Sequence, residues 1–428
     1  MWSKGLRDRI RGILLGEGQL VLRSGSFSLA PHFQKVTSLG LYLHIPFCRQ
    51  ICPYCPYNKV IYQPDLAQQY AEAVLKEIDR YAEIVAGRPI TSFYIGGGTP
   101  TTMLDTGLPR IVEHIYHTFN MQCSIHMESH LNGLSPANLA TIAAMGVEHL
   151  SMGVEALQDH HLRTLCRPYT VVEAISAVER AVAQGFTCVN ADLIFALPGQ
   201  THDELRQAGK MLVEMGVDQI AAYPLFTFPY TEWAPRSKRN RYPSYTLLQK
   251  QRMLHVLEET FHSAGYERTS VWAFTRTGVA RYCSVTVPLY LGLGASGGSY
   301  LPDIFYINTF NVHEYVQALD AGRMPIALSL ELTARMQMAG WLYWRIYETR
   351  FRKSDFAARF GQDFDAVYGR YVQSLSSLGL LTVQGDEIIL TDAGSYWLHA
   401  LQDLFSIDYV AKLWGSSKDN AWPSEVVL

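Results

Sequence analysis

Short apolar segments alternate with longer amphipathic segments between residue 41 and about residue 265. The apolar runs are bounded by turn-forming residues and lie at 41–47, 91–96, 122–128, 148–154, 187–195 and 219–226. The amphipathic stretches lie at 65–85, 107–119, 136–145, 170–184, 202–215 and 244–263. Because the apolar runs lack a clean polar alternation, they are typical of parallel strands buried on both faces. The six strand and helix units predict an α/β fold, a partial (β/α)6 TIM-like barrel with its chemistry at the carboxyl ends of the strands.

The segments outside this alternation divide the rest of the chain. We expect an N-terminal extension at 1–40, the barrel at 41–265 and an extension of the barrel at 266–330. From 331 to 428 the pattern changes to helices and a hairpin around Gly385. This order predicts a mainly helical, winged-helix-like C-terminal domain. Its apolar positions need a partner surface, and the open face of the barrel is the nearest candidate, so we expect this domain to act as a lid.

The composition favours a globular catalytic protein and argues against several partners. The chain has 428 residues, of which 48% are hydrophobic and 18% charged, and its formal net charge is −3. There is thus no overall basic field to attract nucleic acid, and 353–378 lacks a dense Lys/Arg face that could read DNA. No segment approaches the ~18 apolar residues of a membrane span. Because the apolar run at 13–15 is too short for a secretory signal, we expect a cytoplasmic protein.

The start of the chain has a pattern of its own. Apolar residues recur there at near-helical spacing, with cations between them: Trp2, Leu6, Ile10, Ile13 and Leu14 alternate with Lys4, Arg7, Arg9 and Arg11. A basic amphipathic helix of this kind either packs on the barrel or makes a peripheral contact with a membrane surface or an anionic substrate.

Three cysteines carry the strongest chemical signal. Cys48, Cys52 and Cys55 follow the first predicted strand in the spacing CxxxCxxC. The other cysteines are scattered one at a time, at positions 123, 166, 188 and 283. A structural zinc site usually has four protein ligands and a disulfide framework needs paired cysteines, so these two alternatives are the weaker interpretation. Iron–sulfur clusters are normally held by four cysteines, and three thiolates leave one iron of a [4Fe-4S] cluster open to a small molecule.

Glycines and carboxylates follow the next strands. The segment GGGTPT at 96–101 ends the second strand, where glycines let a ligand approach the backbone closely, although a tight turn is the simpler alternative. Glu128 ends the third strand and points to the same rim, unless it is a solvated carboxylate at a strand end. Asp192 lies in the apolar run of the fifth strand, where an unpaired carboxylate would be costly. Both acidic residues are therefore candidates for binding something polar.

The motifs, taken in order, resemble those of the oxygen-independent coproporphyrinogen III oxidase family of radical S-adenosylmethionine (SAM) enzymes. The segments that carry the resemblance are YLHIPFCRQICPYC, FYIGGGTPT, MES, HLSMGVEALQDHHLRTLCR, VNADLIFALPGQT and YLGLGASGGSY, within about residues 41–300. The resemblance implies a radical SAM barrel with a [4Fe-4S] cluster on Cys48, Cys52 and Cys55. It also implies that SAM chelates the open iron of this cluster.

The resemblance further implies which residues hold the cofactors. The cluster and the first SAM correspond to the three cysteines together with Tyr42, Gly97, Gly98, Thr99 and Glu128. A second SAM corresponds to Glu155, Arg167 and Asp192. Among all of these, we expect catalytic roles for Tyr42, Glu155 and Arg167.

Two positions depart from the decarboxylating members of the family. Tyr57 stands where those members have a fourth cysteine, and Glu155 replaces a glutamine. An anion at position 155 could pair with a sulfonium or ammonium cation, or it would be protonated if it were buried. Both differences argue against coproporphyrinogen decarboxylation and leave radical SAM chemistry intact.

Three functions remain open within this resemblance. We expect an enzyme that cleaves one SAM reductively and uses the second to methylate or methylenate an sp2 carbon of a large planar substrate, such as a quinone or tetrapyrrole. The alternatives are oxidative decarboxylation of coproporphyrinogen III and heme binding in a trafficking protein. The expected partners are the planar substrate and a reductant such as flavodoxin or ferredoxin, without nucleic acid.

Overall fold

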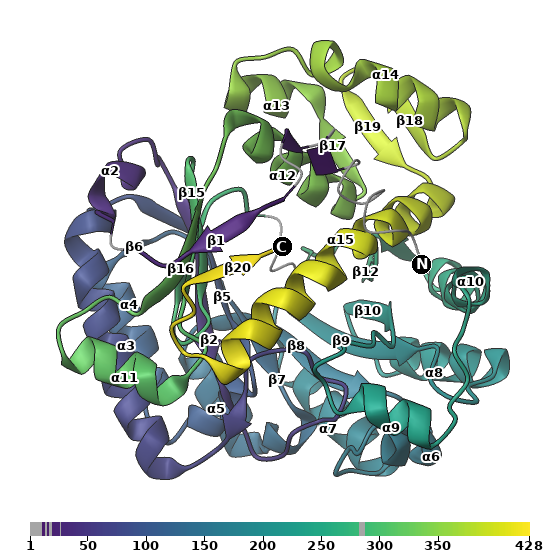
Figure 1. The fold of residues 1–428 in the computed structure, drawn as a ribbon. Helices are drawn as coiled ribbons and strands as arrows, with labels where there is room; N and C mark the ends of the chain where they lie inside the picture. Colours follow the sequence, from purple (N-terminus) through teal and green to yellow (C-terminus); the bar gives the residue numbers. More distant parts are fainter. Residues whose placement is uncertain (1–10, 13–14, 17–18, 26, 282–286) are drawn as a thin grey trace.

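The computed structural model describes residues 11–428 except 13–14, 17–18, 26 and 282–286 (Figure 1). Most of the predicted N-terminal helix therefore lies outside the described residues. Arg11 is described and buried, and its guanidinium donates a hydrogen bond to the carbonyl of Leu428 at 2.9 Å. This cation is thus held against the C-terminal end of the chain. Among the described helices, none combines the length and the apolar character that crossing a membrane requires.

Six parallel strands form the centre of the molecule, as the sequence predicts. In spatial order they are β2 (Leu39–Ile45), β5 (Pro89–Gly97), β7 (Ile125–Ser129), β8 (Val147–Glu155), β9 (Cys188–Phe195) and β10 (Gln219–Pro224). The helices of the barrel are α3 (Pro64–Val85), α4 (Leu108–Thr118), α5 (Pro136–Ala144), α7 (Val171–Ala183), α8 (His202–Glu214) and α10 (Leu247–Ser263). Capping boxes begin α7, α8 and α10, which explains why the sequence locates these helix starts well.

The barrel is incomplete because both of its edges continue into other strands. Beyond β2 the sheet continues through β13 (Tyr290–Leu293), β14 (Gly298–Tyr300), β15 (Ile304–Asn308), β16 (Ile326–Glu331), β1 (Val21–Arg23) and β20 (Glu425–Val427). Beyond β10 it continues through β12 (Ala273–Arg276) and β11 (Tyr266–Arg268). The predicted partial (β/α)6 barrel is thus confirmed, and strands from both ends of the chain extend it.

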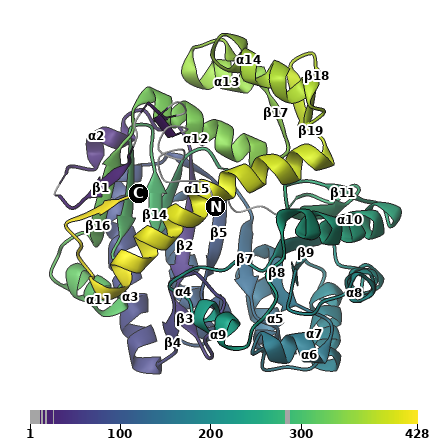
Figure 2. The same ribbon diagram turned by 45° about the vertical axis from the view of Figure 1, so that its right-hand side comes forward.

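The C-terminal segment forms a small domain and then returns to the barrel. The domain contains α12 (Ala334–Tyr347), β17 (Arg350–Arg352), α13 (Lys353–Phe360), α14 (Phe364–Ser377), β18 (Leu381–Gln384) and β19 (Glu387–Leu390). Helices followed by the β18–β19 hairpin match the predicted winged-helix-like order, and the domain has a core of its own around Trp341 and Phe356. The long helix α15 (Asp392–Asp419) then runs across the barrel, as both ribbon views show (Figures 1 and 2).

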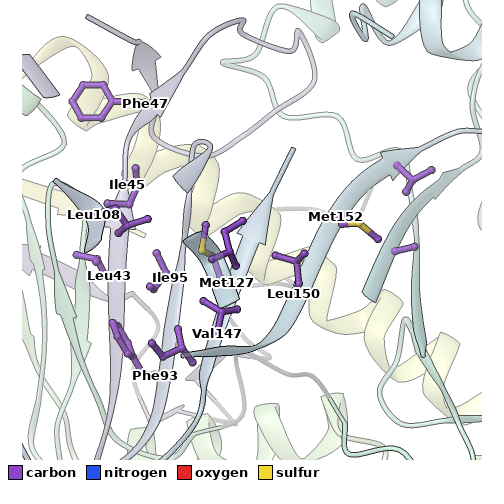
Figure 3. Packing of buried hydrophobic residues seen from close by; sticks show 14 of the residues in the cluster. Leu43, Ile45, Phe47, Phe93, Ile95, Leu108, Met127, Val147, Leu150 and Met152 are labelled. Carbon is purple, nitrogen blue, oxygen red and sulfur yellow. The ribbon is translucent and has the colours of Figure 1, made fainter. Parts of the chain in front are cut away.

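Alternate residues of the central strands serve different purposes. Leu43, Ile95, Met127 and Leu150 pack together in the hydrophobic core, as Figure 3 shows for four neighbouring strands. Residues between these positions are more often polar, and Glu128 lies opposite Ser151 in the register of β7 and β8. Because side chains alternate between the two faces of a strand, one face builds the core and the other supplies polar groups to the barrel interior.

A buried carboxylate joins α3 to the turn after β13. Glu77 is fully buried and accepts hydrogen bonds from Gly294 N (2.8 Å), Asn308 Nδ2 (2.7 Å) and the Tyr315 hydroxyl (2.5 Å). Burial raises the pKa of Glu77 from 4.5 to about 7, and the three donors oppose this rise. Since the folded pKa is the higher one, the stability that Glu77 contributes is fully present below pH 4.5 and is lost as the pH rises through about 7.

Replacing Tyr315 with Phe should therefore destabilise the protein more at about pH 8.5 than at about pH 5.5. At the higher pH the ionised Glu77 loses a charge-assisted hydrogen bond of about 1.5–3 kcal/mol, whereas at the lower pH it loses a neutral one of about 1 kcal/mol. Urea unfolding at the two pH values measures the difference. Tyr81→Phe is the matched control, because the Tyr81 hydroxyl bonds the hydroxyl of Tyr306 at 3.1 Å. A Tyr315→Phe effect that does not depend on pH would contradict this account.

Candidate active site

The cysteine loop leaves the sheet at the carboxyl end of β2. It is closed by pairing of β3 (Phe47–Cys48) with β4 (Val60–Ile61), so the loop begins and ends at the same rim. Within it, the amide of Cys55 donates to the carbonyl of Cys52 at 3.2 Å. Cys48, Cys52 and Cys55 are free thiols that line one cavity of about 480 Å³. The structure therefore brings the three predicted ligands together at the strand ends.

The surroundings of these thiols suit a bound cation. Burial raises the pKa of Cys48 to about 11 and also raises the pKa of Cys55. Two donors face the sulfurs: Thr99 Oγ1 lies 3.5 Å from Cys48 Sγ, and Arg167 Nη1 lies 3.2 Å from Cys52 Sγ. Because metals bind thiolates, iron would supply the positive charge that buried thiolates require. Three converging thiols with no fourth cysteine among the described lining residues fit a [4Fe-4S] cluster with one open iron.

The glycine run forms the wall beside the cysteines. Gly97 has a φ of +115°, and a Cβ there would lie 2.6 Å from Cε1 of His44. A Cβ on Gly98 would meet backbone atoms at 2.8 Å. Only glycine fits these positions without a shift of the neighbours. The Gly97 amide donates to Glu128 at 3.0 Å, and the Tyr94 hydroxyl donates to the other oxygen of this carboxylate. Glu128 is thus a half-buried acceptor that faces the same cavity.

Arg167 joins the cysteine loop to the end of β8. Besides contacting Cys52, its guanidinium donates to Glu155 Oε1 (3.0 Å), Gly153 O (2.6 Å) and the Tyr169 hydroxyl (2.9 Å). The side chains of Arg167 and Glu155 are 5% and 9% exposed. Charges buried to this degree need an opposite charge and further hydrogen bonds in good geometry. Burial raises the pKa of Glu155, whereas Arg167 lowers it. Glu155 is therefore paired within the protein, and its φ of 67° is a strained conformation that this pairing helps to hold.

Asp192 lies on β9 opposite Gly153 and faces the same cavity. Its carboxylate accepts a hydrogen bond from Asn190 Nδ2 at 2.8 Å, and Ser151 Oγ lies 3.4 Å from it. Burial raises the pKa of Asp192 well above its usual value, and the nearby carboxylate of Glu155 raises it further. A protonated Asp192 would be able to donate a hydrogen bond to a ligand in the cavity.

Ten of the eleven predicted site residues line this cavity, and Tyr42 does not. The Tyr42 ring stacks behind Tyr94 with centroids 6.1 Å apart, and its hydroxyl bonds Nδ1 of His44 at 2.8 Å. Tyr42 is thus placed to support the wall of the cavity through Tyr94. Its predicted role at the cofactor remains a prediction.

Several lining residues were not predicted as site residues. They include Tyr54, Tyr94, Tyr223, Phe226, Phe228, Trp272, Tyr347, His399, Asp403, Ser406, Ile407 and Val410. Tyr94 and Tyr223 lie in strands that end at the rim, so the rule that places chemistry at strand ends could have found them. The residues from 399 onward come from α15, which lies within the segment 331–428 that we expect to act as a lid, but no local signal in the sequence singles out these side chains.

Comparison with known proteins decides the family. Residues 42–212 match the profile of the Radical SAM superfamily. This part of the chain is a Radical SAM domain. It is 24% identical to the heme chaperone HemW of Bacillus subtilis over 360 residues, which is 82% of this chain and 95% of that protein. It is 28% identical to the oxygen-independent coproporphyrinogen III oxidase of Escherichia coli over 303 residues, covering 66% of this chain and 65% of that protein.

A solved structure shows the same fold. The coproporphyrinogen III oxidase HemN of Escherichia coli matches with a TM-score of 0.76 and 23% identity, over 92% of this chain and 94% of that one. The predicted likeness to the coproporphyrinogen III oxidase family is confirmed. The expectation of a two-SAM methyltransferase is wrong, because the relatives that match over most of the chain are named heme chaperones or coproporphyrinogen III oxidases.

The chain is therefore a radical SAM enzyme whose cofactors are a [4Fe-4S] cluster and SAM. When bound, the cluster supplies the electron that cleaves SAM to a 5′-deoxyadenosyl radical. The residues of the chain would hold these groups and keep water out: Cys48, Cys52 and Cys55 at the iron, and the Gly97–Glu128 wall beside the open position. An enclosed site matters because a carbon radical reacts with any bystander group that can reach it.

Replacing Cys52 with Ala should abolish most cluster binding. Anaerobically reconstituted wild-type protein should hold about four irons per chain, and the variant should lose the iron and the SAM-perturbed electron paramagnetic resonance signal of the reduced cluster. Iron analysis and spectroscopy measure both. Cys123→Ala is the control, because Cys123 is a free thiol that does not line the cavity. Stoichiometric zinc without iron in the wild type would refute the assignment.

Replacing Glu155 with Gln should raise the reduction potential of the cluster. The substitution removes an anion but leaves Arg167 3.2 Å from Cys52 Sγ, so the net positive charge near the cluster increases. Greater positive charge and hydrogen bonding to the sulfurs favour the reduced cluster. A redox titration measures the potential, with Glu148→Gln, an exposed position of the same strand, as the control. An unchanged potential would show that Glu155 does not act on the cluster.

Proposed function

We propose that this radical SAM enzyme acts on a heme-type tetrapyrrole that lies between the cysteine loop and α15. The lining of the cavity carries this proposal. One wall of the cavity holds the cysteines. The rest of the lining is rich in aromatic side chains, namely Tyr223, Phe226, Phe228, Trp272 and Tyr347. Aromatic and apolar walls with a few polar groups are what a large planar macrocycle requires. The names of the relatives, which refer to heme and to coproporphyrinogen III, support the same substrate class.

Charge favours heme over coproporphyrinogen III. Coproporphyrinogen III carries four propionates, and heme carries two. Among the described lining residues, the Lys and Arg side chains are Lys59 and Arg167, and both already have partners. Lys59 donates to the backbone carbonyls of Cys55 and Tyr57, and Arg167 is paired with Glu155. The same lining contains four acidic residues, Glu128, Glu155, Asp192 and Asp403. Because neither cation is free to pair with a carboxylate of the ligand, a ligand with fewer carboxylates leaves fewer buried anions unpaired.

The wall that includes α15 would hold the macrocycle through contacts with its aromatic side chains. The His399 ring meets Trp272 edge-on, with centroids 5.2 Å apart, and also lies edge-on to Tyr347 at 5.5 Å. Both nitrogens of His399 are engaged, Nδ1 with Gln402 Oε1 at 3.0 Å and Nε2 with Asp403 Oδ1 at 3.3 Å. In this arrangement neither nitrogen is free to coordinate iron. We therefore expect His399 to fix the aromatic wall and not to be an axial ligand.

Oxidative decarboxylation of coproporphyrinogen III is the second candidate. The similarity to the Escherichia coli oxidase over 66% of this chain favours it. The acidic lining and Tyr57, which stands at the position of the fourth cysteine in the decarboxylating members of the family, argue against it. The two candidates differ in substrate and product, so one assay separates them.

The test uses cluster-loaded protein under anaerobic conditions. SAM and a strong reductant are supplied with heme, with coproporphyrinogen III, or with no tetrapyrrole, and 5′-deoxyadenosine is quantified. The proposal predicts that heme increases 5′-deoxyadenosine formation about tenfold or more, which corresponds to a barrier lower by about 1.4 kcal/mol. Release of CO2 from coproporphyrinogen III would establish the second candidate. Tight heme binding without any change in SAM cleavage would instead indicate a carrier and refute the enzymatic proposal.

Replacing Val410 with Arg should weaken heme binding about tenfold or more, because Val410 lines the cavity and a longer charged side chain would occupy the volume of the macrocycle. Absorption titration with heme measures the affinity. Ser416→Arg is the matched control, since Ser416 is an exposed position of the same helix. Equal heme affinity in both variants would place the heme site elsewhere.

A further inference from the structure

Two histidines and a glutamate meet outside the cavity, between α6 and α8. His160 and His161 are neighbours on α6 (Asp159–Thr164), which follows β8, and Glu204 lies in the first turn of α8. One potential ligand atom from each residue lies within 4.8 Å of the other two. None of the three residues lines the cavity described above. They therefore form a separate cluster of metal-binding groups.

His161 is the observation that points to a ligand. Its side chain is 1% exposed, its Nδ1 has no hydrogen-bond partner among the described residues, and its Nε2 faces the carboxylate of Glu204. The nearest charged group is Glu204, whose Oε2 lies 3.5 Å from Nε2 of His161. A buried polar group without a partner is costly, so the site calls for a bound ion or water.

The carboxylate of Glu204 is fixed in place by its helix. Oε2 accepts hydrogen bonds from the Thr201 amide (2.8 Å) and the Thr201 hydroxyl (3.0 Å) in a capping box. Oε1 lies 3.0 Å from Nε2 of His160. Two ligand atoms that are each about 2.1 Å from a tetrahedral zinc ion lie about 3.4 Å from each other. Small side-chain movements would thus convert the present contacts into coordination.

We propose that His160, His161 and Glu204 form a site for a divalent transition-metal ion of the zinc type. Two imidazoles and one carboxylate suit such an ion, and a water molecule would take the fourth position on the exposed side of His160. The ion would fasten α6 to α8. Because α6 lies between Glu155 and Arg167 in the chain, it would also brace the segment that carries the buried pair beside Cys52. The site does not depend on the identity of the tetrapyrrole.

The experiment adds zinc to protein that already carries its iron–sulfur cluster. Competition with a chelator gives the affinity, and X-ray absorption at the zinc edge identifies the ligands. We expect one zinc per chain, with nitrogen and oxygen at about 2.0–2.1 Å and no sulfur at about 2.3 Å. His160→Ala should weaken zinc binding at least tenfold. His117→Ala is the matched control, since His117 is another exposed histidine near a glutamate, Glu113 at 3.8 Å.

A second pair of variants separates metal binding from helix capping. Glu204→Gln should weaken zinc binding at least tenfold by removing the anion. Glu173→Gln should leave it unchanged, because Glu173 has the same capping role, with Thr170 at the start of α7, and belongs to no such cluster of histidines. Absence of zinc binding, sulfur in the coordination shell, or equal affinity in the wild type, His160→Ala and Glu204→Gln would each overturn the proposal.

Discussion

A buried guanidinium holds the cysteine loop to the barrel. Arg167 contacts the sulfur of Cys52, the carboxylate of Glu155 and the carbonyl of Gly153 at the same time. Removing one partner from a buried ion pair typically costs about 3–5 kcal/mol, so these groups depend on one another. The position of the second cysteine is therefore tied to the end of β8, and the left-handed backbone at Glu155 is part of the same arrangement.

The parallel sheet explains why so many polar groups converge beside that pair. Its strands end at one rim, and the residues that face the barrel interior are therefore collected there. Glu128, Asp192 and Glu155 come from three neighbouring strands and line one cavity; Glu155 is buried, and the other two are half-buried. Each has hydrogen-bond donors from the protein, which offset part of the cost of burial. The lining has many carboxyl groups and, among the described residues, no Lys or Arg side chain without a partner, which is a poor match for a substrate with many carboxylates.

The sequence predicts the barrel well because its signals are local. The six strands and six helices lie within a few residues of the predicted ranges, since turn residues, apolar runs and capping residues mark their ends. The cysteines and glycines are found for the same reason. The pairing of Glu155 with Arg167 and the particular residues of α15 that line the cavity were not predicted, because they depend on contacts between distant segments. Glu155 and Arg167 are separated by a helix, and α15, which lines the cavity, follows the small C-terminal domain in the chain.

The cavity has two walls that come from different parts of the chain, which helps to explain how one fold can serve different reactions. The wall that holds the cysteines is built by local motifs of the barrel, whereas His399, Asp403 and Val410 belong to a helix that the barrel does not specify. Changes on that helix can alter the fit of a planar ligand without disturbing Cys48, Cys52 or Cys55. Similarity of fold to a coproporphyrinogen III oxidase therefore does not specify the substrate side of the site. Because the rings and carboxylates of the lining act directly on the ligand, they are the stronger guide to the substrate.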